Sequence, residues 1–275
     1  MKASIIRMVK ALEWMFRYMT KELRVLPDFL IIGAQKSGTT SLYRYLVEHP
    51  KILPSFKKEV HFFDLNYHKG VGWYRAHFPL KVEKDLKAGL TGEATPLYIF
   101  HPHVPQRVHS IIPKVRLIVM LRNPVNRAYS HYWHEVRKGR ERLGFEEAIR
   151  AEERRVKDEL KKAMDNEHYN SFNFIHHTYL ARGIYVEQLR RWMHYFPRKQ
   201  FFIFSSEEFF SNPSKIYLEI LKFLGLPRWE PQEYRVYHKG RYPPMNRFIR
   251  KQLVDFFKPY NEELYRLIGR RFNWD

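Results

Sequence analysis

A glycine-containing stretch at residues 33–40, Gly-Ala-Gln-Lys-Ser-Gly-Thr-Thr, constrains the fold more strongly than any other part of the chain. It follows an apolar run at residues 25–32, which predicts a short strand, and it leads into residues 39–47, which predict a helix ended by His49 and Pro50. A loop that enters a helix presents unpaired backbone N–H groups and the positive end of the helix dipole, and both favour a phosphate. The sequence therefore predicts a phosphate-binding strand, loop and helix.

Further apolar runs predict that this unit belongs to an α/β fold. Residues 115–121 and 200–204 have the length and composition of buried parallel strands. Helices are expected from Pro124 to about residue 138 and from Pro213 to about residue 222. Strands that alternate with helices form a parallel sheet covered on both faces. We therefore expect a P-loop-like three-layer fold, with its ligand at the carboxyl ends of the strands.

The domain organisation is expected to be simple. Residues 27–275 contain no repeat, linker or low-complexity tract, which predicts a single domain. Residues 1–26 predict a basic amphipathic helix that can pack on the domain, pack on a second subunit in a homodimer, or lie on a membrane surface. Residues 138–166 are dominated by Arg, Lys and Glu, which predicts one or two exposed helices with a solvated face.

The composition narrows the partners and the location. Forty-nine Lys and Arg against 29 Asp and Glu give a formal net charge of +20, which attracts anionic ligands. No nucleic-acid partner is expected, because zinc-finger spacing, an aromatic RNA-binding strand and a basic zipper are all absent from the sequence. The chain has no cysteine, so it needs no oxidising compartment. We therefore expect a cytoplasmic location. Peripheral membrane contact through residues 1–26 stays an open alternative.

Two departures from the Walker A pattern indicate which phosphate ligand the loop takes. Gly33 and Gly38 have the Walker spacing, but Thr39 replaces the lysine and the basic residue stands inside the loop as Lys36. Arg122 follows the predicted strand 115–121, where an ATPase or kinase needs an Asp to help hold Mg²⁺. A cation there repels a metal and attracts a second phosphate. The pattern favours a metal-free binder of a doubly phosphorylated nucleotide. Two alternatives stay open: a relative of the P-loop kinases or NTPases, and a non-catalytic protein that binds anions or membranes.

These residues resemble the sulfotransferase family. Residues 29–42 are similar to its 5′-phosphosulfate loop, and residues 117–130 to its 3′-phosphate motif. The similarity continues, in family order, at residues 59–64, 183–192, 223–227 and 238–242. The segments Glu-Val-His-Phe-Phe-Asp and Lys-Gly-Arg-Tyr resemble most the glycosaminoglycan branch, which sulfates heparan-type chains on nitrogen or on the 3-oxygen, and a prokaryotic cytosolic relative of that branch is expected.

The resemblance implies a donor, a reaction and a role for each residue. The donor is 3′-phosphoadenosine 5′-phosphosulfate (PAPS), the product nucleotide is 3′-phosphoadenosine 5′-phosphate (PAP), and no metal takes part. The sulfuryl group moves in line to a hydroxyl or amine, most simply of a saccharide. Lys36 matches the lysine that stabilises charge on the leaving phosphate. The 5′-phosphate is expected on Ser37, Gly38, Thr39, Thr40 and Ser41, the 3′-phosphate on Arg122 and Ser130, and the closing late loop at Lys239, Gly240, Arg241 and Tyr242.

The role of proton acceptor has two candidates. Glu59 matches the family's general base, with His61 as the alternative base. An ion pair between Glu59 and Lys57 or Lys58, and a buried, hydrogen-bonded His61, are the ordinary structural explanations of the same residues. The chain also departs from the glycosaminoglycan enzymes at Ala94, where they carry a lysine, which leaves the acceptor open.

Overall fold

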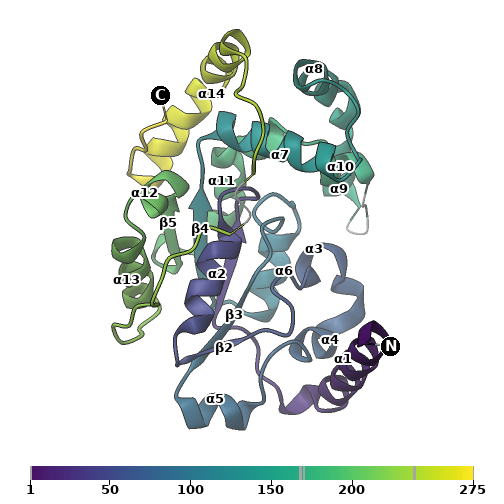
Figure 1. Cartoon of the computed structure of the whole chain (residues 1–275), viewed down its shortest axis with the longest axis vertical. Helices are drawn as coiled ribbons and strands as arrows, with labels where there is room; N and C mark the ends of the chain where they lie inside the picture. Colours follow the sequence, from purple (N-terminus) through teal and green to yellow (C-terminus); the bar gives the residue numbers. More distant parts are fainter. Residues whose placement is uncertain (1, 167–168, 170, 238–239, 275) are drawn as a thin grey trace.

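The computed structural model describes residues 2–166, 169, 171–237 and 240–274, and it contains a central parallel sheet (Figure 1). The five strands are β1 (Phe29–Gly33), β2 (Ile52–Pro54), β3 (Leu90–Ala94), β4 (Arg116–Leu121) and β5 (Phe201–Ser205), in the order β2-β3-β1-β4-β5. Every neighbouring pair is parallel. The α/β fold with a central parallel sheet flanked by helices is confirmed.

Helices cover both faces of this sheet. The helices with ten or more residues are α1 (Lys2–Met19), α2 (Thr39–Glu48), α7 (Pro124–Arg137), α8 (Phe145–Val156), α11 (Tyr185–Tyr195), α13 (Pro213–Phe223) and α14 (Arg247–Ile268). The shorter ones are α3 (Phe62–Leu65), α4 (Gly70–Arg75), α5 (Lys81–Lys87), α6 (Val104–Ile111), α9 (Glu159–Asp165), α10 (Phe172–His176) and α12 (Ser206–Ser211). Short 3-10 turns lie at Lys21–Leu23, Tyr67–Lys69, Ala181–Gly183 and Arg198–Gln200.

The alternation of side chains along β1 divides the core into two parts. Leu30 and Ile32 pack into one cluster with residues of α6 and α11, whereas Phe29 and Ile31 pack into another with residues of α2 and α13. All residues of β1 are buried, which is typical of a central parallel strand and explains its continuous apolar sequence. The same reason makes β4 and β5 predictable, because their runs are equally apolar.

Side-chain caps fix where the helices at the carboxyl edge of the sheet begin. Asn123 Oδ1 accepts hydrogen bonds from the backbone N–H groups of Val125 and Asn126, so α7 starts at Pro124 directly after β4. Ser205 and Glu208 form a capping box that starts α12 directly after β5. Both helices thus begin beside the end of the preceding strand, where a ligand would lie.

The charged segment 138–166 forms the expected helices, α8 and α9, but the expected solvated face is only part of its role. Ala148, Ala151 and Glu152 are buried. The Glu152 carboxylate accepts hydrogen bonds from the backbone N–H groups of Leu180 and Ala181, at 2.6 and 2.9 Å. Figure 1 shows α8, α9 and α10 grouped beside the end of α7. Composition could not predict the burial of Glu152, because its hydrogen-bond partners are distant in the sequence. A buried glutamate of this kind cannot be distinguished from an exposed one by composition.

The N-terminal helix α1 contacts the rest of the chain through its C-terminal half. The Trp14 ring lies 5.7 Å from the Phe56 ring, 5.9 Å from Trp73 of α4 and 4.6 Å from His77. Figure 1 shows α1 beside α4 at the lower right. None of the helices in the described ranges is long and apolar enough to cross a membrane. The division of the chain at residue 26 stays a prediction.

Candidate active site

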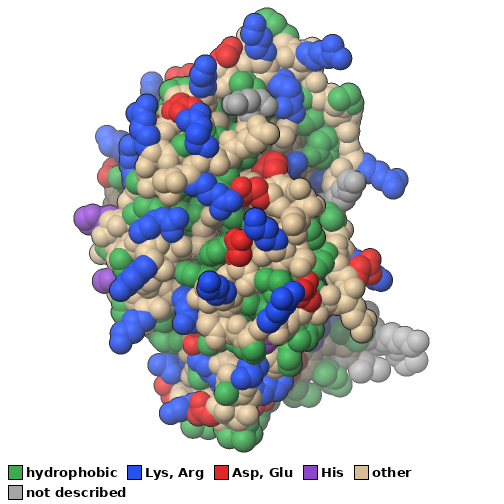
Figure 2. Space-filling model, turned by 90° about the vertical axis from the view of Figure 1, so that its left-hand side faces the viewer, with side chains coloured by type: hydrophobic (Ala, Val, Ile, Leu, Met, Phe, Trp, Pro, Cys, Tyr) green, Lys and Arg blue, Asp and Glu red, His purple; other side chains and the backbone are tan. Residues whose placement is uncertain are grey.

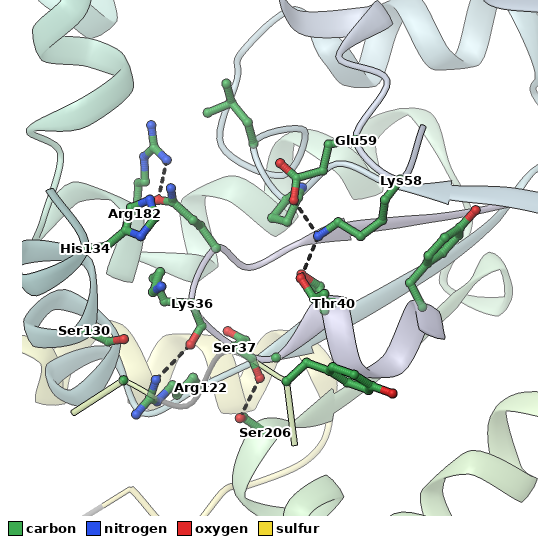
Figure 3. A pocket seen from close by; sticks show the side chains of 18 of the residues that line it. Lys36, Ser37, Thr40, Lys58, Glu59, Arg122, Ser130, His134, Arg182 and Ser206 are labelled. Atoms are coloured by element: carbon green, nitrogen blue, oxygen red, sulfur yellow. Dashed lines mark hydrogen bonds and ion pairs between the residues drawn. The ribbon is translucent and has the colours of Figure 1, made fainter. Parts of the chain in front are cut away.

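The glycine-containing loop connects β1 to α2 and is held by side chains from three other elements. Gln35 Oε1 accepts a hydrogen bond from Arg182 (2.7 Å), the Lys36 carbonyl from Arg122 (2.8 Å), and the Ser37 carbonyl from the Ser206 hydroxyl (2.7 Å). Figure 3 shows the bonds of Arg122 and Ser206 to the loop. Hydrogen bonds from the protein itself therefore hold the shape of the loop.

Gly38 is required by both the conformation and the crowding of this loop. Its φ angle of 106° lies in the region that L side chains rarely adopt, and a Cβ there would lie 2.7 Å from the Phe210 ring. Gly38 is also the residue before α2, so its conformation directs the first N–H groups of α2 toward the cavity. Any side chain at this position would displace the loop or the Phe210 ring.

A cavity of about 1440 Å³ opens over the loop, and most of the predicted site residues line it. It is larger than the roughly 300–1,000 Å³ of a typical small-ligand pocket, so it has room for more than one small ligand. The predicted residues that line it are Lys36, Ser37, Gly38, Thr39, Thr40, Glu59, His61, Arg122, Ser130, Gly240 and Tyr242. They come from the loop, from the segment before α3, from the end of β4, from α7 and from the late loop.

Three predicted residues are not placed in this cavity. Ser41 is buried behind the loop, where its Oγ accepts a hydrogen bond from the Tyr237 backbone N–H at 3.0 Å. Arg241 is exposed and does not line the cavity. Lys239 lies outside the described residues.

Positive charge gathers on one side of the loop. In Figure 3, Arg122 and Ser130 lie on that side, whereas Lys58 and Glu59 lie on the other. Burial lowers the pKa of Lys36 to about 8, and the nearby guanidinium groups of Arg137 and Arg122 contribute to the shift. An ammonium whose neighbours are cations is stabilised by an incoming anion.

An unpartnered polar atom lies beside these cations. The Ser37 Oγ is buried and has no hydrogen-bond partner among the residues that the structure describes. A buried hydroxyl without a partner is costly, and a ligand oxygen would satisfy it.

Glu59 belongs to a chain of alternating charges on the other side of the loop. Its carboxylate lies 2.5 Å from Lys58 Nζ and 3.5 Å from His61 Nε2, and His61 Nδ1 lies 2.8 Å from Asp64 Oδ2. Burial alone would raise the pKa of Glu59, but the hydrogen bond from His61 and the Lys58 ammonium outweigh it and lower the pKa to about 2. Burial opposes the charged form of His61, but Asp64 and Glu59 raise its pKa to about 10.

These pKa shifts separate the two candidate bases. At neutral pH Glu59 is ionised and can accept a proton, whereas His61 is already protonated and cannot. The Glu59 side chain is 40% exposed, so water partly screens its ion pairs and the acceptor can reach it. The expected ion pair of Glu59 with Lys58 is present, and it lies inside the cavity.

Lys58 is a cavity residue to which sequence analysis gave no functional role. Its Nζ donates a hydrogen bond to Thr40 Oγ1 at 2.6 Å and thereby connects Glu59 to the first turn of α2. Its carbonyl accepts a hydrogen bond from the Ala94 N–H at 3.0 Å, which holds the segment against the end of β3. Nothing in the spacing of the sequence predicts this contact, because residues 58 and 94 meet only through the fold.

Glu93 anchors the segment that carries Glu59. It is fully buried at the end of β3 and accepts hydrogen bonds from the Val60 N–H (3.1 Å) and from the hydroxyls of Tyr74 (2.9 Å) and Tyr98 (2.9 Å), with Thr95 as a fourth donor (2.6 Å). Burial raises the pKa of Glu93 to about 7, against these hydrogen bonds. The position after it, Ala94, points into the opposite core cluster with residues of α2.

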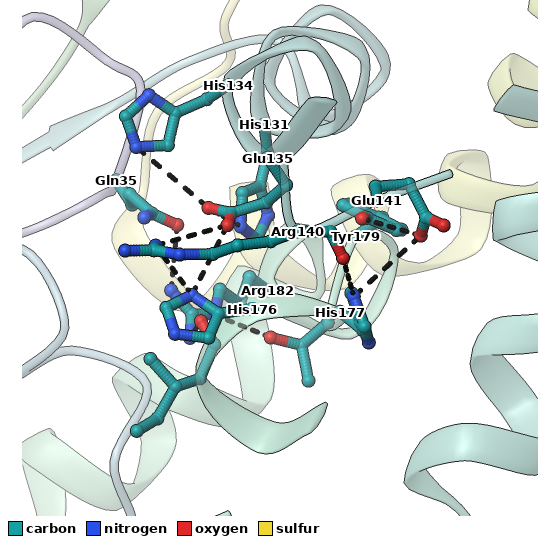
Figure 4. A network of polar contacts seen from close by, with 12 residues as sticks. Gln35, His131, His134, Glu135, Arg140, Glu141, His176, His177, Tyr179 and Arg182 are labelled. Carbon is teal, nitrogen blue, oxygen red and sulfur yellow. Dashed lines mark hydrogen bonds and ion pairs between the residues drawn. The ribbon is translucent and has the colours of Figure 1, made fainter. Parts of the chain in front are cut away.

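A second polar network forms the far wall of the cavity (Figure 4). The buried Glu135 of α7 lies 3.3 Å from Arg140 Nη1, 3.3 Å from His176 Nδ1 and 3.5 Å from His131 Nε2. Burial opposes ionisation of Glu135, but the hydrogen bonds from His131 and His176 lower its pKa well below the usual range. Sequence analysis gave these residues no role, because they come from α7, α10 and the turn between α7 and α8.

Comparison with known proteins identifies the class of protein that this fold and cavity define. A family model described as the sulfotransferase domain matches residues 26–254. The chain belongs to the sulfotransferase family. It is similar to a solved sulfotransferase from Alicyclobacillus acidocaldarius, with 32% identity and a TM-score of 0.69 over 90% of this chain and 98% of that one.

Curated relatives place the chain near the predicted branch. It is 31% identical to the membrane-associated sulfotransferase kil1 of Dictyostelium discoideum, over 92% of this chain and 67% of that protein. It is 32% identical to the human bifunctional heparan sulfate N-deacetylase/N-sulfotransferase 3, over 89% of this chain but 30% of that protein. It is 30% identical to the mouse heparan sulfate glucosamine 3-O-sulfotransferase 3B1, over 91% of this chain and 65% of that protein. The resemblance to the glycosaminoglycan sulfotransferases is confirmed.

Proposed function

We propose that this sulfotransferase moves the sulfuryl group of PAPS to a hydroxyl or amine of a saccharide acceptor and releases PAP. The observation that carries the proposal is the placement of two cations, Lys36 and Arg122, around one cavity and joined by the hydrogen bond from Arg122 to the Lys36 carbonyl. A nucleotide with phosphate groups on both its 5′ and 3′ positions matches this pair.

The loop supplies the groups that a phosphosulfate needs. Backbone N–H groups at the start of α2 and the free Ser37 hydroxyl would donate to the 5′-phosphate. The Lys36 ammonium would stabilise the negative charge that develops on the bridging oxygen as its bond to sulfur breaks. Arg122 would bind the 3′-phosphate through two guanidinium N–H groups, with the Ser130 hydroxyl beside it.

Glu59 would accept the proton of the attacking hydroxyl or amine. Its pKa of about 2 results from the hydrogen bond from His61 and the ion pair with Lys58, which together outweigh burial, and an acceptor that displaces the Lys58 ammonium would make Glu59 a stronger base. His61, protonated and held by Asp64, would then keep Glu59 oriented as a positioning residue. His61 is not proposed as the base.

The proposal of a saccharide acceptor rests on the heparan sulfate enzymes among the relatives. The lysine missing at Ala94 would be replaced in part by Lys58, whose ammonium already lies at the start of α2. A cytoplasmic location stays a prediction.

The test is sulfuryl transfer with labelled PAPS to saccharides that carry free hydroxyl or amino groups. We expect transfer by the wild type, and a loss of at least about a hundredfold in rate for Glu59→Gln, since general-base catalysis contributes roughly 10²–10⁴-fold. Glu48→Gln of α2 is the matched control and should retain the wild-type rate. Sulfuryl transfer by Glu59→Gln at the wild-type rate would exclude Glu59 as the general base. Magnesium-dependent ATP hydrolysis with no sulfuryl transfer would favour the kinase or NTPase alternative instead.

A further inference from the structure

The N-terminal helix α1 is attached to the domain by the face that normally points to water. Arg7, Lys10, Trp14, Arg17 and Lys21 recur at the spacing of one helix face. Of these, Trp14 stacks on Phe56, and the Arg17 guanidinium lies 4.9 Å from the centre of the same ring. Contact with the domain is therefore made by an aromatic ring and by the basic side chain of Arg17.

The apolar face of α1 consequently points away from the domain. Met8, Leu12, Met15 and Met19 recur every three or four residues, with Val9 and Phe16 beside them. Each of these six side chains is more than half exposed, and Met19 is 77% exposed. An amphipathic helix in a globular domain hides this face, so the orientation calls for a partner that covers it.

The exposed apolar surface continues past the end of α1. Leu23, Val82 and Leu86 are between 59% and 83% exposed and line a hollow between the 3-10 turn after α1 and α5. Figure 2, which faces the side of the molecule away from α1, shows hydrophobic side chains mixed with both basic and acidic ones along the lower part of the molecule. Charged residues of both signs also line the hollow: Lys81, Lys84, Glu22 and Asp85.

Charge and size favour a lipid surface over a second copy of the chain. The exposed Arg7 and Lys10 lie on the helix face opposite the apolar one, but they give α1 a net positive charge, because its one acidic residue, Glu13, is paired with Arg17 at 3.0 Å. Eighteen residues at about 1.5 Å each give a face about 27 Å long and roughly 10 Å wide. That is on the order of 300 Å², well below the ~800 Å² that each partner of a standard protein interface buries.

We propose that α1 docks this protein on anionic membrane surfaces, with Met8, Leu12, Met15, Phe16 and Met19 entering the boundary between head groups and acyl chains. The helix lies in the plane of the surface, and the positive charge of Arg7 and Lys10 acts across the roughly 10 Å width of the helix, which is about one Debye length, to attract acidic head groups. The attachment is peripheral and reversible.

Flotation of the full chain with lipid vesicles tests this docking. Vesicles of phosphatidylcholine with about one third phosphatidylserine should carry the wild type upward, and raising the salt from about 0.1 M to about 0.5 M should weaken binding severalfold. The double variant Leu12→Glu with Phe16→Glu should bind at least about tenfold less. Both side chains face solvent, so the variant should fold and keep its thermal response to PAP.

The matched control places the same substitutions at equally exposed apolar residues elsewhere, Met164→Glu with Phe248→Glu, and should float as the wild type does. Wild type that stays at the bottom of the gradient, or equal flotation of both double variants, would overturn the proposal. A wild-type dimer in light scattering that becomes monomeric in Leu12→Glu with Phe16→Glu would also overturn it, because a second copy would then cover the helix.

Discussion

Replacement of Arg122 by alanine removes two contacts of this side chain, one with the loop and one with the proposed 3′-phosphate, and their effects on ligand binding can be told apart. In the structure its guanidinium donates to the Lys36 carbonyl, so part of its effect comes through the shape of the loop. The proposed contact with the 3′-phosphate adds a charged hydrogen bond, which is worth about 1.5–3 kcal/mol. We therefore expect Arg122→Ala to raise the dissociation constant of PAP roughly 10- to 150-fold.

This loss can be measured as a thermal shift. PAP at a hundred times its wild-type dissociation constant adds about 2.7 kcal/mol of stability, whereas a variant that binds thirtyfold more weakly gains about 0.9 kcal/mol at the same concentration. For a chain of this size 1 kcal/mol corresponds to about 2–4 °C. The shift in Tm should fall from about 5–11 °C in the wild type to about 2–4 °C in Arg122→Ala.

A ligand without the 3′-phosphate provides the deciding comparison. Adenosine 5′-monophosphate depends on the shape of the loop but has no group for Arg122 to pair with. Arg122→Ala should therefore weaken the binding of PAP much more than the binding of adenosine 5′-monophosphate. Arg228→Ala, on the exposed surface, should weaken the binding of neither ligand. If Arg122→Ala weakens both ligands by the same factor, Arg122 acts only on the loop and the 3′-phosphate assignment is refuted.

Three other predictions follow from the same cavity. Because Lys36 loses its proton at a pKa of about 8, the dissociation constant of PAP should rise as the pH increases above 8, and Lys36→Arg should remove that rise in a titration from pH 7 to about 9.5. Gly38→Ala should lose at least about 1 kcal/mol of stability in urea unfolding, because an L residue in a left-handed conformation is strained and its Cβ meets Phe210. Lys58→Met should lower the rate of sulfuryl transfer about tenfold or more without changing the PAP thermal shift. Lys57→Met is the control and should retain the wild-type rate. Equal rates for the two variants would exclude a role for Lys58 in the reaction.

Sequence analysis found the strands in which nearly every residue is apolar. β1, β4 and β5 are nearly continuous apolar runs because both of their faces are covered. β3 was not predicted, since Thr91, Gly92 and Glu93 stand in its middle. Glu93 is tolerated there only because donors from three other parts of the chain reach it, and a local pattern does not contain those donors.

The site divides in the same way. Lys36 and Arg122 were predictable because Lys36 stands in the loop after β1 and Arg122 directly after the neighbouring strand β4, so the strand order brings them together. Lys58 was missed as a cavity residue because its position depends on a contact with Ala94 across the fold. Ser41 was expected at the phosphate, but consecutive residues of a helix point about 100° apart, and the side chain after Thr40 turns toward Tyr237.

The three hydrogen bonds that hold the loop at Gln35, Lys36 and Ser37 affect how fast and how tightly the loop can bind a ligand. Fixing the backbone of a mobile residue costs about 1–2 kcal/mol, so a disordered five-residue loop would subtract roughly 5–10 kcal/mol from the free energy of binding. Here that ordering occurs when the domain folds. Association then needs no conformational search by the loop, and changes in affinity among variants of this cavity should be expressed mainly as changes in the dissociation rate.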